Sequence, residues 1–263
     1  MTLPAITTKQ QEILKLLYRF RFVDRIQLQA FLQHKEKRRS SRWLKDLRDK
    51  HYVEWIYSTD FTEKTKPAVY YLSLNGVRLL RTLGDYPAAE LRKRYKESER
   101  QPVFIARCLI LADCAINLQA RSAENKDVTY TNITQADYAD PEHEYHFLSE
   151  LGPHLYFRKQ AGKVTTNYLL ELFDTTTPRY MVKKRLKDYV TYLDDGDWES
   201  ETSDDTPPIV LLACPTTAEL IYAKRRIRRL LEDVSDEENI HIRLATIEQL
   251  KQSGVTGKIW EEV

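Results

Sequence analysis

The sequence predicts a mixed fold of α+β and α/β character. Three helices and a β-hairpin come first, and an α/β domain with a central mixed sheet follows. Two observations predict this order. Apolar residues recur at helical spacing through residues 8–50, and two short runs rich in β-branched and aromatic residues follow at 52–58 and 68–74. From residue 128 onward, apolar runs of strand length alternate with longer amphipathic stretches.

The helices of the N-terminal part are predicted from their apolar faces and their capping residues. Residues 8–20 place apolar side chains on one face, and Thr7 or Thr8 can serve as the N-cap. Asp24 can cap a second, shorter helix. Residues 37–50 form the third, which we expect to pack on the first two through its leucines.

The hairpin completes this part of the chain. Its two strands flank a polar, proline-ended tip that carries Lys64 and Lys66, and residues 74–83 return to a helix. Three helices, a hairpin and a closing helix predict a winged helix-turn-helix domain over residues 1–84.

A connecting region is predicted over residues 85–123. Its first part, 85–101, is highly charged and short of large aliphatic residues, which predicts a linker or an exposed helix. Its second part, 102–122, is a strongly apolar helix with Pro102 in its first turn. We expect this helix to pack against the second domain or against another subunit.

The second domain is predicted over residues 124–263. Gly162 joins two neighbouring strands, and residues 197–207 read as an acidic, polar loop. The other predicted elements are strands 128–133, 154–159, 167–173, 208–215 and 241–247, helices 178–194 and 217–232, and a short C-terminal helix.

Charge is distributed unevenly along the chain. Residues 1–100 hold 22 Lys or Arg and 12 Asp or Glu, a net of +10, whereas the remainder holds 19 and 27, a net of −8. The sum is the overall charge of +2. A basic front half predicts that this half alone faces an anionic partner.

The third predicted helix concentrates this positive charge. In a helix-turn-helix, the second helix of the pair enters the major groove of duplex DNA, where arginine reads guanine and lysine holds phosphate. Positions 38, 41, 42 and 45 share one stripe by helical spacing. The residues predicted to contact DNA are Lys37, Arg38, Arg39, Ser41, Arg42, Lys45, Arg48, Lys64 and Lys66.

Two basic stretches also have a plainer interpretation. A charge run such as 35–50 is most often a solvated helix face, and only its place in the predicted fold favours DNA. The helix over 217–232 carries five Lys or Arg between Lys224 and Arg229. It forms either a second phosphate-binding surface or the solvent face of an amphipathic helix, and we favour the solvent face.

Several classes of protein are disfavoured by the composition. The three cysteines form no CxxC pair, so we expect neither a disulfide framework nor a Cys-rich metal site. No glycine-rich nucleotide motif and no GxSxG motif is present. We expect no cofactor, no membrane span and a cytoplasmic location. His143 and His146 have a spacing that could bind a metal, but without a nearby third ligand we predict surface histidines and no metal site.

The stretch from Leu151 to Leu193 resembles the C-terminal domain of the replication-relaxation family of plasmids and integrative elements, whose members also begin with a winged helix. The matching positions are Pro153, His154, Glu171, Asp174, Thr175, Thr176, Lys183 or Lys184, Lys187 and Tyr189. The resemblance implies a task in plasmid replication, DNA relaxation or transfer.

The same hairpin is similar to the core of the PD-(D/E)xK nucleases, which need an acidic residue on one strand and an acid-x-Lys on the next. Here His154 stands where the first acid is expected, and no lysine follows Glu171 by two positions. Imidazole is a poor Mg²⁺ ligand, since hard cations prefer oxygen. The resemblance therefore implies a degenerate nuclease-like domain. If it were active, His154, Glu171 and Asp174 would carry the chemistry. Otherwise Glu171 and Asp174 are expected to cap the helix that starts near Pro178.

The combined prediction is a non-catalytic, DNA-binding accessory protein of a mobile element. Its expected partners are double-stranded DNA, a second copy of the chain, and a relaxase or replication enzyme. The alternatives are a winged-helix transcriptional regulator with a sensing or dimerisation domain, an Mg²⁺-dependent DNA nuclease, and a protein-interaction adaptor with a vestigial winged helix.

Overall fold

The computed structural model describes residues 4–34, 36–57, 65–84, 86–202, 206–234 and 239–263. The chain forms two compact units, and each is mixed α and β as predicted. The first contains residues 1–116 with 139–142, and the second contains 117–138 with 143–263. The division thus falls inside a long helix. The boundaries expected at residues 84 and 123 remain predictions.

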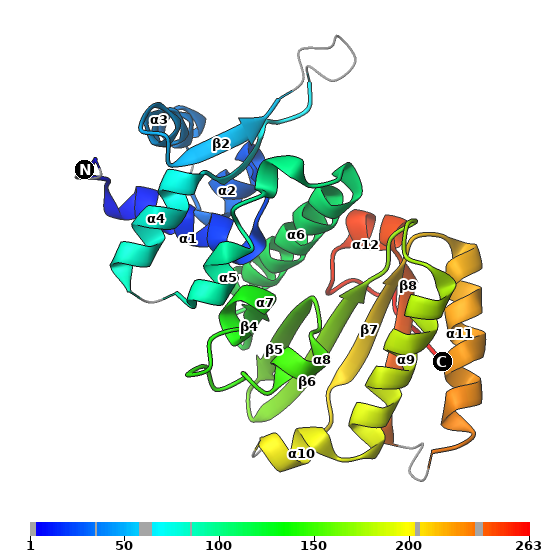
Figure 1. Ribbon diagram of the computed structural model, residues 1–263. Coiled ribbons are helices and arrows are strands. Elements are labelled where there is room, and N and C mark those ends of the chain that lie inside the picture. Colours follow the sequence, from blue (N-terminus) through cyan, green and yellow to red (C-terminus); the bar gives the residue numbers. More distant parts are fainter. Residues whose placement is uncertain (1–3, 35, 58–64, 85, 203–205, 235–238) are drawn as a thin grey trace. The chain divides into compact units, whose positions relative to one another are not determined.

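The first unit begins with three helices and three short strands (Figure 1). Its elements are α1 (Thr8–Phe20), β1 (Val23–Asp24), α2 (Arg25–Phe31), α3 (Lys37–Asp49), β2 (Val53–Ile56), β3 (Val69–Leu72), α4 (Leu74–Leu83), α5 (Ala88–Arg92), the 3-10 helix η1 (Glu97–Glu99) and the first part of α6 (Pro102–Glu124). The helices predicted over 8–20, 37–50, 74–83 and 102–122 are confirmed.

Reciprocal side-chain caps fix where the first two helices begin. The Thr7 hydroxyl accepts from the Gln10 backbone N–H, and the Gln10 side chain returns to the Thr7 N–H. Asp24 and Gln27 make the same arrangement at the start of α2. Each pair satisfies donors that a helix N-terminus otherwise leaves open. Thr7, rather than Thr8, is therefore the first cap.

The predicted hairpin is part of a three-stranded antiparallel sheet. The strand order is β1-β3-β2, and Trp55 lies opposite Tyr70 across the hairpin. Gly76 of α4 approaches the Tyr52 carbonyl so closely that a Cβ atom would clash with it. A glycine is required there because it lets the backbone of α4 pack directly against the start of β2.

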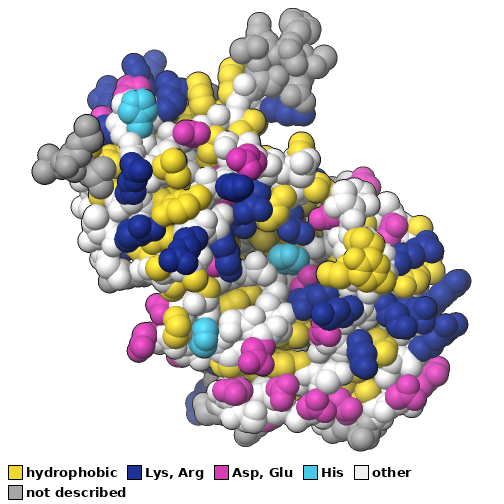
Figure 2. Space-filling model, in the orientation of Figure 1, with side chains coloured by type: hydrophobic (Ala, Val, Ile, Leu, Met, Phe, Trp, Pro, Cys, Tyr) yellow, Lys and Arg dark blue, Asp and Glu magenta, His cyan; other side chains and the backbone are white. Residues whose placement is uncertain are grey.

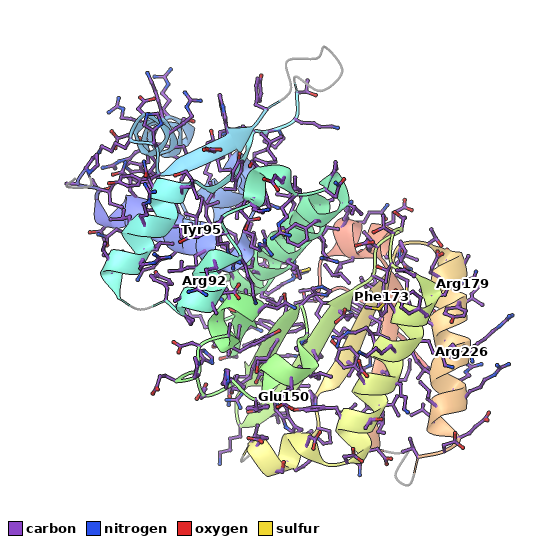
Figure 3. All side chains as sticks on the ribbon, viewed as in Figure 1. Arg92, Tyr95, Glu150, Phe173, Arg179 and Arg226 are labelled. Carbon is purple, nitrogen blue, oxygen red and sulfur yellow. The ribbon has the colours of Figure 1, made fainter. Side chains whose placement is uncertain are left out.

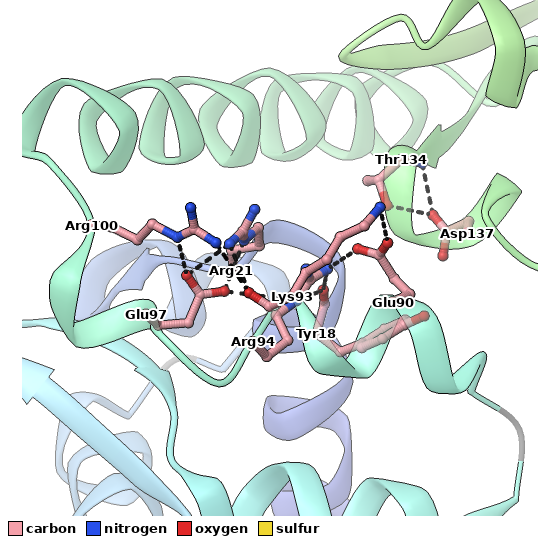
Figure 4. A network of polar contacts seen from close by, with 9 residues as sticks. All are labelled: Tyr18, Arg21, Glu90, Lys93, Arg94, Glu97, Arg100, Thr134 and Asp137. Atoms are coloured by element: carbon pink, nitrogen blue, oxygen red, sulfur yellow. Dashed lines mark hydrogen bonds and ion pairs between the residues drawn. The ribbon is translucent and has the colours of Figure 1, made fainter.

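Residues 86–101, within the stretch expected to be a linker or an exposed helix, belong to the first unit and are partly buried. Glu90, Arg94 and Glu97 are almost completely buried in it. Arg21 contacts both oxygens of Glu97 at 2.8 and 2.9 Å, and Arg94 reaches Glu90 at 2.8 Å and the Tyr18 carbonyl at 2.8 Å (Figure 4). These five residues form the inner ion cluster. Pairing explains how charged side chains can lie inside the unit.

The first part of α6 packs inside the first unit, whereas Asn117, in the part that belongs to the second unit, accepts from the Thr256 backbone N–H and hydroxyl at 3.2 and 2.9 Å, so the expected packing against the second domain is met in part. Phe104 and Ile105 join a cluster with Phe22, Tyr71 and Cys108. The Gln27 amide also donates to the Leu109 carbonyl and to Asp113, at 2.8 and 2.7 Å.

Among the described residues, α6 is also long and apolar enough to cross a membrane, by length and composition only. The sequence was expected to contain no such stretch. This is weak evidence for a membrane, because the core helix of a soluble protein meets the same test.

The second unit is built on a mixed sheet. Its elements are the rest of α6, β4 (Val128–Thr134), α7 (Gln135–Tyr138), α8 (Leu148–Leu151), β5 (Leu155–Ala161), β6 (Val164–Leu172), α9 (Arg179–Asp194), α10 (Asp197–Glu201), β7 (Ile209–Cys214), α11 (Thr217–Leu231), β8 (Ile242–Thr246), α12 (Ile247–Ser253) and β9 (Glu261–Glu262). The strand order is β4-β5-β6-β7-β8-β9, with β6, β7 and β8 parallel and the other pairs antiparallel.

The helices α9 and α11 lie side by side against this sheet (Figure 1). Leu186 and Ile227 are fully buried with Leu169 and Leu212 of the strands. The acidic stretch after α9, which was expected to be a loop, contains the short helix α10. The Trp198 side chain anchors it by packing, fully buried, against aromatic rings of the same core.

Candidate functional site

The helix α3 has a buried side and a basic side. Leu44 and Leu47 are buried, and the helix contacts α1 and α2. Arg38, Arg39 and Arg42 are exposed. The spacing of the leucines therefore orients α3 as the sequence predicts, with its arginines toward solvent.

The remaining predicted contact residues are placed as follows. Lys45 and Lys66 are exposed, whereas Ser41 and Arg48 are half-buried. Lys64 and the side chain of Lys37 lie outside the described part of the chain. Within that part, none of Arg38, Arg39, Arg42 and Lys45 forms an ion pair with a carboxylate.

Aromatic side chains from the hairpin meet this basic helix. The Arg48 guanidinium lies 4.0 Å from the centre of the Trp55 ring. Trp55 stacks on Tyr57 with ring centres 5.5 Å apart, and both rings are almost half exposed. Residues two apart on an extended strand share a face, so the spacing of Trp55 and Tyr57 in the sequence already indicates that the two rings lie on one side.

The helix and the hairpin enclose a hollow of about 540 Å³. We call it the basic-aromatic hollow. It is lined by Arg25, Ser41, Lys45, Arg48, Trp55, Tyr57, Thr65, Lys66, Pro67, Ala68 and Tyr70. Arg25 was not predicted as a functional residue. Its Nη1 atom is buried and has no hydrogen-bond partner within the described residues.

In the second unit, Glu171 lies at the centre of a buried polar network. Its Oε2 atom accepts from Arg185 Nη2 at 2.6 Å and from the Tyr189 hydroxyl at 2.7 Å. Burial would raise the pKa of Glu171, but the charges of His154 and Arg185 and the hydrogen bonds from Arg185 and Tyr189 outweigh burial, so its pKa lies below the usual value. Glu171 stays ionised and is bonded inside the unit.

His154 adjoins this network through one ring nitrogen. Its Nδ1 atom lies 3.1 Å from the Leu172 backbone nitrogen and 3.3 Å from Glu171 Oε1. The Leu172 N–H can only donate, so Nδ1 accepts from it when the ring is neutral. In that state Nδ1 cannot also donate to Glu171.

Asp174 is engaged in its own turn. Its Oδ1 atom accepts from the Thr176 backbone N–H and hydroxyl at 2.9 and 2.6 Å, and from the Thr177 hydroxyl at 3.1 Å. The helix α9 begins after Pro178 without a side-chain cap. The expectation that Glu171 and Asp174 cap this helix was therefore wrong: one binds side chains of α9, and the other closes the preceding turn.

His143 and His146 both lie within hydrogen-bonding distance of backbone groups. His143 Nδ1 accepts from the Tyr145 N–H at 3.1 Å, and His146 Nδ1 lies 2.9 Å from the Tyr138 carbonyl. Over the described ranges, no group of three His, Cys, Asp or Glu side chains is arranged to hold a metal ion.

Comparison with known proteins identifies the family. The model of the replication-relaxation family matches residues 14–204, from within α1 to just past α10. The comparisons find no significant match among curated proteins or solved structures. Because the match covers well over half of the chain, the chain belongs to the replication-relaxation family, which suggests a role in the replication or relaxation of mobile genetic elements.

Proposed function

We propose that residues 1–84 form a winged helix-turn-helix that places α3 in the major groove of duplex DNA. In this proposal the chain is a cytoplasmic, non-catalytic accessory protein, and it locates a DNA site for the replication, relaxation or transfer of a mobile element. The second unit serves as a degenerate nuclease-like scaffold.

The order of elements in the first unit supports this proposal. Three helices are followed by a hairpin that pairs with a short strand lying between α1 and α2. In a helix-turn-helix of this order, the helix that reads DNA is the one before the hairpin. Here that helix is α3.

The single observation that carries the proposal is the outward face of α3. Arg38, Arg39, Arg42 and Lys45 project from it, and no carboxylate of the described residues is paired with them. Arginine can donate two parallel hydrogen bonds to guanine, and both residue types bind phosphate. A row of cations without paired carboxylates is electrostatically complementary to a polyanion such as DNA.

The basic-aromatic hollow supports a second kind of contact beside the helix. A buried guanidinium nitrogen without a partner is costly, and Arg25 Nη1 is in that state within the described residues. Nη1 itself has no surface open to a ligand, so a phosphate oxygen would instead accept charge-assisted hydrogen bonds from Lys45, Arg48 or Lys66, which also line the hollow. Trp55 and Tyr57 offer flat faces to the sugar or to a base. We assign the hollow to the DNA backbone next to the groove.

The Glu171 network supports the non-catalytic part of the proposal. A PD-(D/E)xK site needs its carboxylates open to Mg²⁺, whereas Glu171 already binds Arg185 and Tyr189. Arg185 would have to leave before a cation could approach that oxygen. We therefore expect no Mg²⁺-dependent strand cutting.

Two partners are part of the same proposal. Winged-helix proteins often bind as dimers, with two half-sites about one helical turn apart. A homodimer on a palindromic site is the assembly we propose, with a relaxase or replication enzyme as the protein it serves. A transcriptional regulator would use the same first unit, and only the location of the bound site would distinguish the two.

The test is a titration of duplex DNA from the genetic neighbourhood of the chain, with and without Mg²⁺. We expect the R38A/R42A variant to lose binding and the R78A/K96A variant to keep it. Arg78 and Lys96 are exposed in the same unit but outside α3, so the second variant controls for net charge. If about six phosphates are contacted, wild-type affinity falls by about three decades between low and moderate salt.

Three outcomes would contradict the proposal. Equal affinities of the two variants would remove α3 from the interface. Failure of the wild type to bind any duplex at low salt would favour an adaptor with a vestigial winged helix. Cutting that needs Mg²⁺ would make the second unit a nuclease.

A further inference from the structure

We infer that the second unit has a binding surface of its own for the phosphate backbone of duplex DNA, on the outward side of α9 and α11. The inference takes from the proposed function only that the partner is a nucleic acid. The residues that bind it are argued independently. The surface, here called the α9–α11 basic face, consists of Arg179, Lys183, Lys187, Arg225, Arg226 and Arg229.

The residues of this face lie in rows on two neighbouring helices. Arg179, Lys183 and Lys187 follow each other at four-residue spacing on α9, and Arg225 and Arg229 do so on α11. The opposite sides of both helices are buried against the sheet. Figure 2 shows Lys and Arg side chains gathered over these helices, and Figure 3 labels Arg179 and Arg226.

One tyrosine lies beside cations from both helices of this face. The guanidinium of Arg179 lies 5.2 Å from the centre of the Tyr222 ring, and that of Arg226 lies 5.9 Å from it. Arg179 comes from α9 and Arg226 from α11. Two cations that would otherwise repel are thus held near one ring, where each also gains a cation–π contact.

The charge of this face is not balanced locally. Within the described residues, none of its six cations forms an ion pair with a carboxylate. Residues 101–263 nevertheless carry a net charge of −8, so acidic side chains are plentiful, and Asp188, next to Lys187 on α9, lies near Arg185 rather than pairing with this face. Like charges four residues apart destabilise a helix. The arrangement therefore opposes folding and fits an anionic ligand.

The shape and composition of the face favour DNA over a lipid surface. A helix that binds a membrane inserts an apolar side into it. The apolar sides of α9 and α11 are already buried in the core, with Val182 and Leu220 among them. The outward side is a face of two helices whose exposed apolar residues are Tyr180, Met181 and Ile221 among six cations. Such a face suits sequence-independent contact with a duplex backbone.

The sequence alone favoured the solvent-face interpretation of 217–232. Water alone can solvate the charges of one such helix. The structure adds a second row of cations, from α9, to the same surface. Repulsion among the cations of two helices is greater than within one helix, and an anionic ligand would relieve it. The helix α11 also lies outside the residues that match the family.

The experiment compares four forms of the full chain on a 30-bp duplex of arbitrary sequence, by fluorescence anisotropy at several salt concentrations. K183Q/K187Q/R225Q/R229Q removes four charges from the face. K126Q/K163Q/K251Q/K258Q removes four exposed charges elsewhere in the second unit. K183R/K187R/R225K/R229K keeps the charges and checks that the positions tolerate substitution. The wild type completes the set.

We expect the first variant alone to change. The slope of log K against log salt should fall by about one unit for each lost phosphate contact, and by up to about four in total. Affinity at moderate salt should fall at least about tenfold, which is the size of effect that several phosphate contacts produce. The control and the charge-retaining variant should match the wild type.

Other outcomes overturn the inference. It fails if the first variant matches the control, if single-stranded oligonucleotide binds the face more tightly than duplex, or if vesicles containing phosphatidylserine bind in preference to DNA. The proposed function fails separately. If R38A/R42A binds as wild type while the α9–α11 variant does not, the α3 assignment is wrong and this surface stands.

Discussion

Arg185 and Glu171 form a buried ion pair in the second unit, with 2.6 Å between Arg185 Nη2 and Glu171 Oε2. The Tyr189 hydroxyl donates to the same oxygen. The carboxylate, on β6, is thus bonded to two side chains of α9.

Removing one partner of this pair should destabilise the chain strongly. R185M leaves the Glu171 carboxylate buried without its cation, which typically costs about 3 kcal/mol or more in the free energy of unfolding. K184M changes an exposed cation on the same helix and should stay within about 0.5 kcal/mol of wild type. Urea unfolding at pH 7 measures both. A loss below about 1 kcal/mol for R185M would show that the pair does not hold α9 in place.

The same carboxylate predicts a pH dependence. Burial acts to raise the pKa of Glu171, but its charged neighbours and hydrogen bonds lower it below 4.5. A group whose folded pKa is depressed contributes stability above its unfolded pKa and loses it as pH falls through the folded value. Wild type should therefore exceed E171Q in stability at pH 7, and the gap should close below about pH 4.5. Urea midpoints from pH 7 to 3.5 test this, and a constant or widening gap would contradict it.

The inner ion cluster of the first unit offers a matched pair of glutamates. Glu97 is buried between arginines, whereas the side chain of Glu99, two residues later, is mostly exposed. E97Q leaves Arg21 without its carboxylate, while Arg94 keeps Glu90, and it should lower the free energy of unfolding by about 3 kcal/mol. E99Q should change it by less than about 0.5 kcal/mol, as expected of a surface pair. Similar effects of the two substitutions would mean that the cluster contributes little.

The three thiols should be unreactive in the folded chain. Burial raises the pKa of Cys108 to about 11 and that of Cys214 to about 12, and it also raises the pKa of Cys114. Because the thiolate is the reactive form, a thiol reagent at pH 8 should modify none of them until urea is added. Three thiols should then react. Immediate reaction of any thiol in the native chain would be inconsistent with this burial.

Local patterns predicted the elements well because periodicity and caps act over a few residues. The helix α1 follows from its apolar face, and its start follows from Thr7. The partial burial of residues 86–101 was not predicted, because their charges are satisfied by distant partners. Arg21 pairs with Glu97, 76 positions later, and no local pattern contains that pairing.

The residues of the candidate sites also divide into those that local patterns predict and those that depend on the folded structure. The outward arginines of α3 were predictable, since Leu44 and Leu47 fix the helix orientation. Arg25 was not, because the hollow that it lines exists only once the helix and the hairpin are folded together. The acidic stretch near Trp198 was misread as a loop, although a lone tryptophan among charges is a sign of an anchored segment.

The central claim is that the arginines of α3 enter the groove of duplex DNA, and cross-linking from this helix tests it most directly. The buried native thiols should leave an introduced cysteine as the reactive one, so R42C can carry a thiol-specific photo-crosslinker, with R78C on α4 as the control. We predict cross-links from R42C to base edges of the major groove and few from R78C. Equal yields from the two variants, or cross-links from R78C alone, would contradict the account.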